Sequence, residues 1–253
     1  MITLYRFGAF LGTPDSSPFV IKVMMLLKLA HLPYTEATGN PLTAPHGLLP
    51  YIVDDKVKIA DSTTIRRHIE RKYDFDFDAG LSAEQRGIAW AVERVCEDHL
   101  YFVMLKSRWL DRKNFRAGLG KYMFGVVPAP ARPLVKAMLT RANRKRLVGH
   151  GLGRLSPAEI DDLGTRDIEA LAAILGDKRY LVGDRPCGAD ATLFGQLTAL
   201  LTPPLGSPVR DAILRHPNLV RYVERITAEY FAAAPAAATA PRAIGAAGVT
   251  VRL

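Results

Sequence analysis

The sequence predicts a small α/β domain followed by an all-helical domain. Strand and helix signals alternate over the first 75 residues, whereas apolar residues after residue 82 recur with the 3.6-residue period of helices. A chain of 253 residues, of which 49% are hydrophobic, is long enough to bury the cores of two domains. We assign residues 1–75 to the α/β domain, 76–82 to a linker, 83–235 to the helical domain and 236–253 to a low-complexity tail.

A serine-containing turn joins the first strand to the first helix. Residues 2–7 have the character of a strand, and residues 19–31 place apolar side chains on one helical face. Between them, Ser17 stands at the N-cap position and Pro18 at the first helical position. Free N–H groups and the positive end of the helix dipole favour an anion or a thiolate here, and Ser16 or Ser17 adds a side-chain donor.

A hairpin and a second helix complete the α/β domain. Gly39-Asn40-Pro41 and Pro45-His46-Gly47 punctuate a passage that we assign to turns. Residues 51–53 and 57–60 are expected to form a hairpin. The next helix begins at Ser62, with Asp61 as N-terminal charge and Ser62 as cap.

Helices account for the second domain. A long helix is expected from residue 82 to about residue 111, with one face lined by Ile88, Val92, Val95, His99 and Phe102, so that His99 is a core histidine. Residues 113–133 are rich in Gly and Pro and are expected to be irregular. Further helices are expected at residues 133–147, from the capping box Ser156–Glu159 onward, at 188–201 and at 218–231.

Cysteine usage and hydropathy indicate a reducing compartment. Cys96 and Cys187 are the only cysteines and stand far apart, which argues against a disulfide framework, a zinc site or a dithiol redox centre. The N-terminus lacks a signal peptide, and no apolar stretch reaches the roughly 18 to 20 residues that span a bilayer. We expect a soluble, cytoplasmic protein with no metal and no membrane partner.

The charge of the chain predicts small anionic ligands. Its 34 Lys and Arg outnumber 25 Asp and Glu, which gives a net charge of +9. The densest cluster, residues 141–146, has no interleaved aromatic residues and no nucleic-acid motif. A solvated helical face is therefore favoured, and no nucleic-acid partner is expected.

Three segments of the first domain together resemble the glutathione transferase superfamily, in which a thioredoxin-like α/β domain precedes an all-helical bundle. They are the turn Ser17–Val20, the segment Gly47–Ile52 and the pair Asp61-Ser62. The run Leu181–Pro186 followed by Ala189-Asp190 is similar to a folding motif of the helical domain. Within the superfamily, the chain resembles the metaxin-like branch, which includes failed-axon-connections proteins and bacterial relatives. The residues that carry this narrower resemblance are the segments Asp15–Val20, Ile59–Ser62, Asp98–Tyr101 and Ser107–Trp109.

The resemblance implies that Ser17 is the catalytic residue. Its hydroxyl would donate a hydrogen bond to the thiolate of bound glutathione, and the thiolate, not the serine, would be the nucleophile. Ser16 and Tyr5 are rival donors, because some transferases use a tyrosine at the end of the first strand. From the residues alone, Ser17 is equally an ordinary N-cap.

The same resemblance implies how the rest of glutathione is held. Pro50 would be preceded by a cis peptide bond, so that the backbone of Leu49 pairs with the cysteinyl part of the ligand. Asp61 and Ser62 would bind the γ-glutamyl carboxylate at a helix N-terminus. The ordinary alternatives are a trans proline at a strand start and a simple helix cap.

Two residues depart from the pattern of the superfamily. Leu48 stands where many relatives carry Lys or Gln, so a contact to the glycyl carboxylate is missing. Cys187 stands where the helical-domain motif usually has Ser or Thr, three residues before Asp190. Because a thiol accepts hydrogen bonds poorly, this change bears on stability more than on chemistry.

The electrophile would bind between the two domains. Tyr101 and Arg108 lie about two helical turns apart and are candidates for the wall of that pocket. The favoured alternative is structural: Tyr101, Trp109 and Trp90 as core aromatics, and Arg108 as an interdomain ion-pair partner.

Two functions follow from the resemblance. The first is a glutathione transferase that uses glutathione as co-substrate against a small electrophile in detoxification and forms a homodimer. The second is a non-catalytic binding or assembly protein of metaxin type. Fold alone does not separate them.

Overall fold

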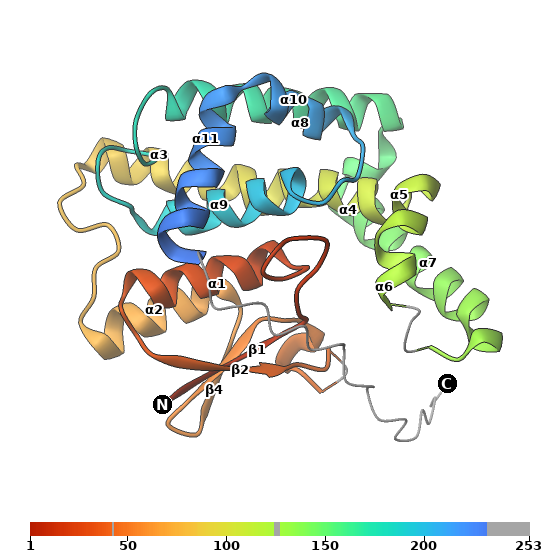
Figure 1. Ribbon diagram of the computed structural model, residues 1–253, viewed down its shortest axis with the longest axis horizontal. Coiled ribbons are helices and arrows are strands. Elements are labelled where there is room, and N and C mark those ends of the chain that lie inside the picture. Colours follow the sequence, from red (N-terminus) through yellow and green to blue (C-terminus); the bar gives the residue numbers. More distant parts are fainter. Residues whose placement is uncertain (42, 124–126, 232–253) are drawn as a thin grey trace.

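An α/β unit and a helical unit pack against each other in this protein (Figure 1). The computed structural model describes residues 1–41, 43–123 and 127–231. The contact between the units is centred on α1 (Pro18–Leu29) and α9 (Gly188–Leu201). The predicted tail, from residue 236, lies outside the described residues.

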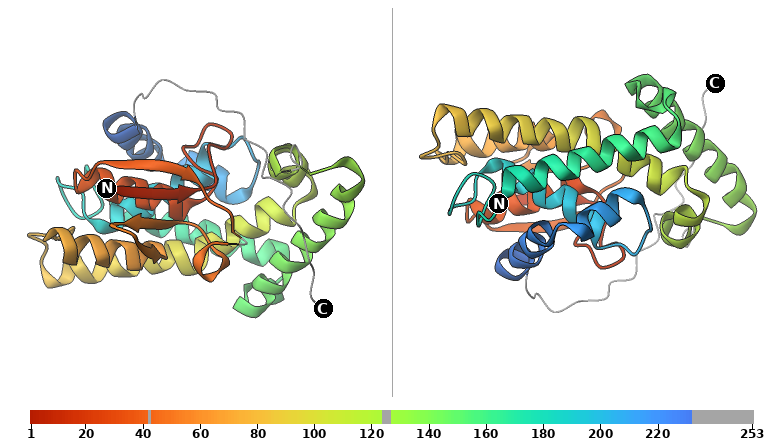
Figure 2. Two further views of the ribbon diagram at one scale, coloured as in Figure 1. Left: turned by 90° about the horizontal axis from the view of Figure 1, so that it is seen from below. Right: turned by 90° about the horizontal axis from the view of Figure 1, so that it is seen from above.

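The α/β unit is built on a four-stranded mixed sheet with the order β2-β1-β3-β4. Its elements are β1 (Ile2–Arg6), β2 (Tyr34–Thr38), a short helical turn η1 (Pro45–Gly47), β3 (Tyr51–Asp54), β4 (Val57–Ala60) and α2 (Ser62–Tyr73). Strand β1 is parallel to β2 and antiparallel to β3, and β3 is antiparallel to β4. Helices α1 and α2 lie between the sheet and the helical unit (Figures 1 and 2).

The helical unit starts with one long, continuous helical rod. Its parts are α3 (Ala83–Arg94), a π-helical segment η2 (Val95–Leu100) and α4 (Tyr101–Trp109). The remaining elements are α5 (Arg112–Ala117), α6 (Leu119–Met123), η3 (Ala129–Ala131), α7 (Arg132–His150), η4 (Leu152–Arg154), α8 (Pro157–Leu175), α10 (Pro208–Arg215), α11 (Pro217–Ile226) and η5 (Thr227–Phe231).

Helix α9 is the centre of the helical unit, because nearly all of its side chains are buried. Its first turn is fixed by the buried carboxylate of Asp190, which accepts hydrogen bonds from the Cys187 N–H at 2.8 Å and from the Leu181 N–H at 2.9 Å. The Tyr222 hydroxyl donates to the same carboxylate at 2.8 Å. Burial raises the pKa of Asp190. The cysteine at position 187 therefore leaves the carboxylate half of the cap in place.

Most elements form where the sequence predicts them. The first strand, the first helix, the hairpin, the long rod and the helix after Ser156 are confirmed within a few residues. Ser156 accepts from the Glu159 N–H, and Glu159 accepts from the Ser156 N–H, as the capping box predicts.

Four elements contradict the sequence predictions or escaped them. Strand β2 lies in the passage assigned to turns, and helices α5 and α6 occupy most of residues 112–123, although residues 113–133 were expected to be irregular. Helix α10 was not predicted. Strand β2 was missed because it is a polar edge strand whose side chains are mostly exposed.

The predicted buried face of the long rod is shifted. The buried apolar residues are Ala89, Val92, Cys96, Leu100, Val103, Met104 and Leu105. A π-helical turn adds one residue per hydrogen-bonded ring and so rotates the later positions relative to a regular helix. His99 is consequently not a core residue: its Nδ1 pairs with Asp167 at the half-buried contact with α8.

Candidate functional site

Three loops leave the sheet at the same edge. The strand register places Tyr5 of β1 opposite Tyr51 of β3, and Tyr51 opposite Ala60 of β4. The chain that follows Tyr5 leads to Ser17, the chain that precedes Tyr51 carries Leu49 and Pro50, and the chain that follows Ala60 is Asp61-Ser62. The topology therefore gathers at one sheet edge the segments that the sequence predicts to form a site. We call this place the sheet-edge site.

The hydroxyl of Ser17 is free for a ligand. Ser17 is the N-cap residue of α1, with extended backbone angles (φ −102°, ψ 125°) and Pro18 after it, but its side chain makes no capping hydrogen bond. The N–H groups of Val20 and Ile21 bond to the Ser17 carbonyl. Among the described residues, the Phe19 N–H has no such partner. The helix start thus offers one hydroxyl and one backbone donor. The prediction that Ser17 is the N-cap residue is confirmed, but its side chain does not make the capping hydrogen bond.

A buried aspartate shapes the turn that carries Ser17. The carboxylate of Asp15 accepts from the Ser17 N–H at 2.9 Å and from the Gly8 N–H at 2.7 Å, while Arg6 Nε donates to it at 3.2 Å. Burial raises the pKa of Asp15 to about 6 against the opposing effect of these hydrogen bonds and of the Arg6 charge. The Thr13 hydroxyl donates to the Asp15 carbonyl at 2.7 Å. The position of Ser17 is therefore fixed by side chains that the sequence patterns do not reveal.

The second loop has the backbone geometry that the resemblance implies. The peptide bond between Leu49 and Pro50 is cis. The side chain of Leu49 is buried, whereas that of the preceding Leu48 is 53% exposed. Next to this loop, the ring of Tyr5 stacks on that of Tyr51, with 4.3 Å between ring centroids. Tyr5 thus lies at the site edge, where it remains a rival to Ser17.

The third loop presents a second unclaimed serine. The Asp61 carboxylate caps α2 by accepting from the Thr63 and Thr64 N–H groups at 2.9 and 3.0 Å. Asp61 itself has φ 72°, a backbone conformation that is rare for non-glycine residues and that clusters at ligand sites. Ser62 does not cap the helix: its hydroxyl and N–H are without a partner among the described residues, although its side chain is 2% exposed.

Arg108 does not line an open pocket, and the expectation that it contacts the electrophile is wrong. Its guanidinium is buried and donates to the Ser16 carbonyl at 2.7 Å and to the Ala199 carbonyl at 2.5 Å. Burial lowers the pKa of Arg108 to about 10. Arg108 therefore ties the turn before α1 to α9. This role is close to the structural alternative, with backbone carbonyls in place of an ion-pair partner.

Tyr101 does lie beside the turn that carries Ser17. Its ring meets that of Phe19 edge to face, with 4.9 Å between centroids, and is half-buried. Trp90, expected to be a core aromatic under the structural alternative, is 51% exposed, so that part of the alternative is wrong. Trp109 is partly buried against the core, as that alternative expects.

Two aromatic residues near the turn were missed by sequence analysis. Phe10, in the loop before α1, packs against Tyr122 of α6, with 5.1 Å between ring centroids. Tyr122 is 43% exposed. Since residues 113–133 were expected to be irregular, nothing in the sequence placed α6 next to this loop.

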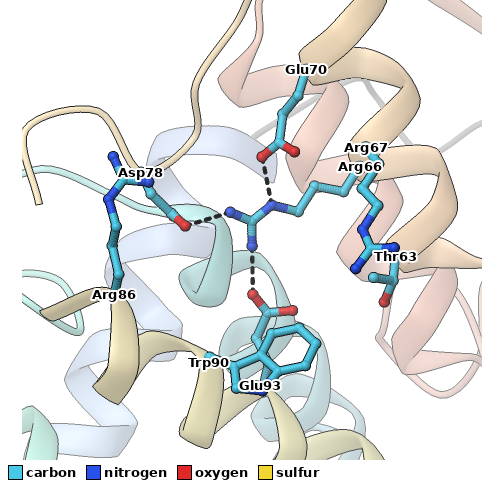
Figure 3. A pocket seen from close by; sticks show the side chains of 8 residues that line it. All are labelled: Thr63, Arg66, Arg67, Glu70, Asp78, Arg86, Trp90 and Glu93. Atoms are coloured by element: carbon cyan, nitrogen blue, oxygen red, sulfur yellow. Dashed lines mark hydrogen bonds and ion pairs between the residues drawn. The ribbon is translucent and has the colours of Figure 1, made fainter. Parts of the chain in front are cut away.

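A cavity of about 180 Å³ lies between α2 and α3 (Figure 3). Its centre is the Arg66 guanidinium, which pairs with Glu70, Asp78 and Glu93 at 2.9, 2.6 and 2.5 Å. Burial alone would lower the pKa of Arg66, but the carboxylates of Glu93 and Asp78 raise it. The central guanidinium and the three carboxylates around it are thus already paired within the protein, which makes this cavity a poor candidate for an electrophile site.

A buried ionic network extends from this cavity to α1. Lys22 is 1% exposed, and its Nζ lies 3.1 Å from Glu93 and 2.6 Å from Glu97. Arg66 shares Glu93, and Arg94 shares Glu97 at 2.6 Å. The network joins both helices of the α/β unit to the long rod of the helical unit.

Comparison with known protein families matches both units of the chain. Residues 18–114 match the family described as Glutathione S-transferase N-terminal domain. Residues 164–226 match the family described as Glutathione S-transferase, C-terminal domain. In the described part of the chain, no helix is long and apolar enough to cross a bilayer.

Several relatives cover most of this chain. It is 36% identical over 244 residues to the isoprene-epoxide–glutathione S-transferase of Rhodococcus sp. strain AD45, across 91% of this chain and 99% of that protein. It is 28% identical over 243 residues to Failed axon connections of Drosophila melanogaster, across 91% of this chain but 58% of that longer protein. It is 30% identical over 222 residues to Metaxin-1 of Mus musculus, across 80% of this chain and 69% of that protein.

Solved structures show the same fold at low sequence identity. A glutathione transferase family member from Pseudomonas fluorescens Pf-5, determined with two glutathione molecules bound, is similar with a TM-score of 0.60 and 16% identity. The alignment covers 90% of this chain and 88% of that one.

Proposed function

Because the chain belongs to the glutathione S-transferase family, with metaxin-like relatives, we propose that it binds reduced glutathione at the sheet-edge site and activates its thiol against a small electrophile. The observation that carries the proposal is the convergence of Ser17, the Leu49–Pro50 loop and Ser62 at one sheet edge. Both serine hydroxyls are unclaimed there, which is what a polar ligand with a thiol and a carboxylate requires.

Ser17 has the role of thiolate donor in this proposal. Its hydroxyl and the Phe19 N–H stand at the positive end of the α1 dipole, where a negative charge is favoured. Asp15 and Arg108 are positioning residues, since one holds the Ser17 N–H and the other the Ser16 carbonyl. The protein keeps the glutathione sulfur ionised and orients it toward the electrophile, and it forms no covalent bond to the ligand.

Ser62 and the start of α2 have the role of carboxylate holders. The Asp61 side chain satisfies the N–H groups of Thr63 and Thr64, which leaves the Ser62 hydroxyl and N–H for the γ-glutamyl end of the ligand. The Leu49 backbone is assigned to the cysteinyl part. Exposed Leu48 offers no charge to the glycyl carboxylate, so we expect modest affinity.

The electrophile pocket is proposed to lie against Tyr101. Supporting this are its contact with Phe19 and the relative from Rhodococcus, which is described as acting with glutathione on an isoprene epoxide. Tyr122, which packs on the buried ring of Phe10, extends the aromatic wall on the other side of the loop. An apolar wall with phenol hydroxyls suits a small apolar epoxide: the sulfur attacks a ring carbon, the C–O bond breaks, and the oxygen stays on the product as an alkoxide that takes a proton from a phenol and becomes an alcohol.

A non-catalytic assembly role is the second candidate. It is favoured by the relatives Failed axon connections and Metaxin-1, whose names specify no transferase, and by the lack of a charged residue at position 48. This role predicts that the sheet-edge site does not bind glutathione.

Calorimetric titration with reduced glutathione tests the proposal. We expect heat of binding with the wild-type protein. The dissociation constant of Ser62→Ala should be about tenfold larger, because a hydrogen bond to a charged group is lost. The matched control is Thr64→Ala, which removes an exposed hydroxyl from the same helix and should leave affinity unchanged. An absence of heat and of thermal shift with millimolar glutathione would favour the assembly role.

A further inference from the structure

The positive charge of the chain is concentrated in one segment. Residues 112–158 contain eleven Lys and Arg and no Asp or Glu. Since the whole chain carries +9, the remaining residues together carry −2. The attraction for anions therefore belongs to this segment and not to the protein surface in general.

The described helices of this segment form one end of the molecule. Figures 1 and 2 show α5, α6 and α7 together at one end of the long axis, away from α3 and the β3–β4 hairpin. Helix α7 is 19 residues long, yet only Asn143 and Leu147 are buried in it. Most of this helix therefore faces solvent.

The outward face of α7 combines apolar and cationic side chains. Leu134 and Met138, one helical turn apart, are 73% and 60% exposed. Arg141 and Lys145 continue the same stripe at spacings of three and four residues, and Arg144 lies beside it. We call these five residues the basic face. Large apolar side chains this exposed next to each other mark a contact surface better than scattered single ones.

The cations of the basic face have no partner among the described residues. By contrast, Lys136 and Arg146, although exposed, lie over the rings of Phe115 at 5.0 Å and Tyr101 at 6.0 Å. The charges of these two cations thus have contacts within the protein. Nothing in the described structure uses the charge of Arg141, Arg144 and Lys145.

We propose that the basic face docks on the surface of an anionic phospholipid membrane. Basic helices with exposed apolar residues lie in the interface, where cations meet the headgroups and apolar side chains enter the boundary of the acyl region. Leu134 and Met138 are the inserting residues, and Arg141, Arg144 and Lys145 are the headgroup contacts. Binding to a membrane surface needs no helix that spans the bilayer. The expectation of no membrane partner was drawn from the lack of a spanning segment, so it does not exclude binding of this kind.

Two other occupants fit the basic face less well. A second copy that met this face with its own basic face would bring like charges together, so a contact of the face with itself is disfavoured. A nucleic acid would pair with the cations but leave Leu134 and Met138 without a contact, and α7 contains no Phe, Tyr or Trp for base stacking.

Flotation with phospholipid vesicles at low ionic strength tests the proposal. Wild-type protein should bind vesicles of phosphatidylcholine with about 30 mol % phosphatidylserine and not vesicles of phosphatidylcholine alone. Replacing Arg141, Arg144 and Lys145 by Gln should weaken binding about 100-fold, at roughly fivefold per cation. Replacing Leu134 and Met138 by Ser should weaken it about tenfold, even where the charge is intact.

The matched control replaces three exposed cations elsewhere, Lys58, Arg215 and Arg221, by Gln, and should bind like the wild type. All of these positions are exposed, so circular dichroism should show unchanged folding. Three results would overturn the proposal: equal binding to both vesicle types, equal loss in the control variant, or tighter binding to duplex DNA than to anionic vesicles at equal phosphate concentration and salt.

Discussion

Replacing Lys22 by Met should lower the free energy of unfolding by about 3 to 5 kcal/mol. The Lys22 ammonium is buried between Glu93 and Glu97, and methionine has a similar length but no charge. In this variant Arg66 still pairs with Glu93, and Arg94 still pairs with Glu97. Arg66 neutralises Glu93 only in part, because it also pairs with Asp78 and Glu70. Urea unfolding followed by circular dichroism measures the loss.

Two further variants make the Lys22 prediction specific. Arg166→Met removes an ion pair with Asp162 in which the side chains are 72% and 62% exposed, and should cost no more than about 0.5 kcal/mol. Adding Glu97→Gln to Lys22→Met should recover about half of the loss, because the buried negative charge disappears. A loss for Lys22→Met as small as that for Arg166→Met would show that the network is not buried.

Gly195→Ala should destabilise the protein by about 3 kcal/mol, through overpacking. A Cβ at this position would lie 2.6 Å from the Pro18 carbonyl oxygen and 3.2 Å from the Lys22 nitrogen. Both are backbone atoms of α1, so no side-chain rotation relieves the clash and the two helices must separate. Because Pro18 adjoins Ser17, glutathione binding should weaken as well.

The matched control for Gly195 is Gly87→Ala in α3. A Cβ there meets nothing within 4 Å, and alanine is the better helix former. Thermal unfolding should show this variant to be as stable as the wild type or stabilised by up to about 1 kcal/mol. If the two alanine variants melt alike, α1 and α9 do not cross as closely as described.

The sequence predicts the elements that have a strong apolar period or a complete cap. The β3–β4 hairpin and the helix after Ser156 are examples, since each depends on residues close together in the chain. Strand β2 is different, because its polar residues become a strand only by pairing with β1. The π-helical turn at Val95–Leu100 has no sequence signal either, and it moves every later residue of the rod to a new face.

The candidate site likewise has residues that the sequence predicts and residues that it does not. Ser17, Pro50 and Ser62 are recognised from short motifs, and the strand register brings their loops to one edge. The groups that hold this arrangement are long-range partners: Arg108 reaches Ser16 across 92 residues of sequence. A single sequence gives no signal for such a contact, so the sequence offers this arginine only as a candidate pocket residue or as an interdomain ion-pair partner.

The most direct test of the account is the pKa of the glutathione thiol when bound, followed by the ultraviolet absorbance of the thiolate. The account predicts a bound pKa below the free value of about 8.5, raised by about one to two units in Ser17→Ala and unchanged in Tyr5→Phe. A bound thiol that titrates like free glutathione, or one that responds to Tyr5→Phe and not to Ser17→Ala, would contradict it.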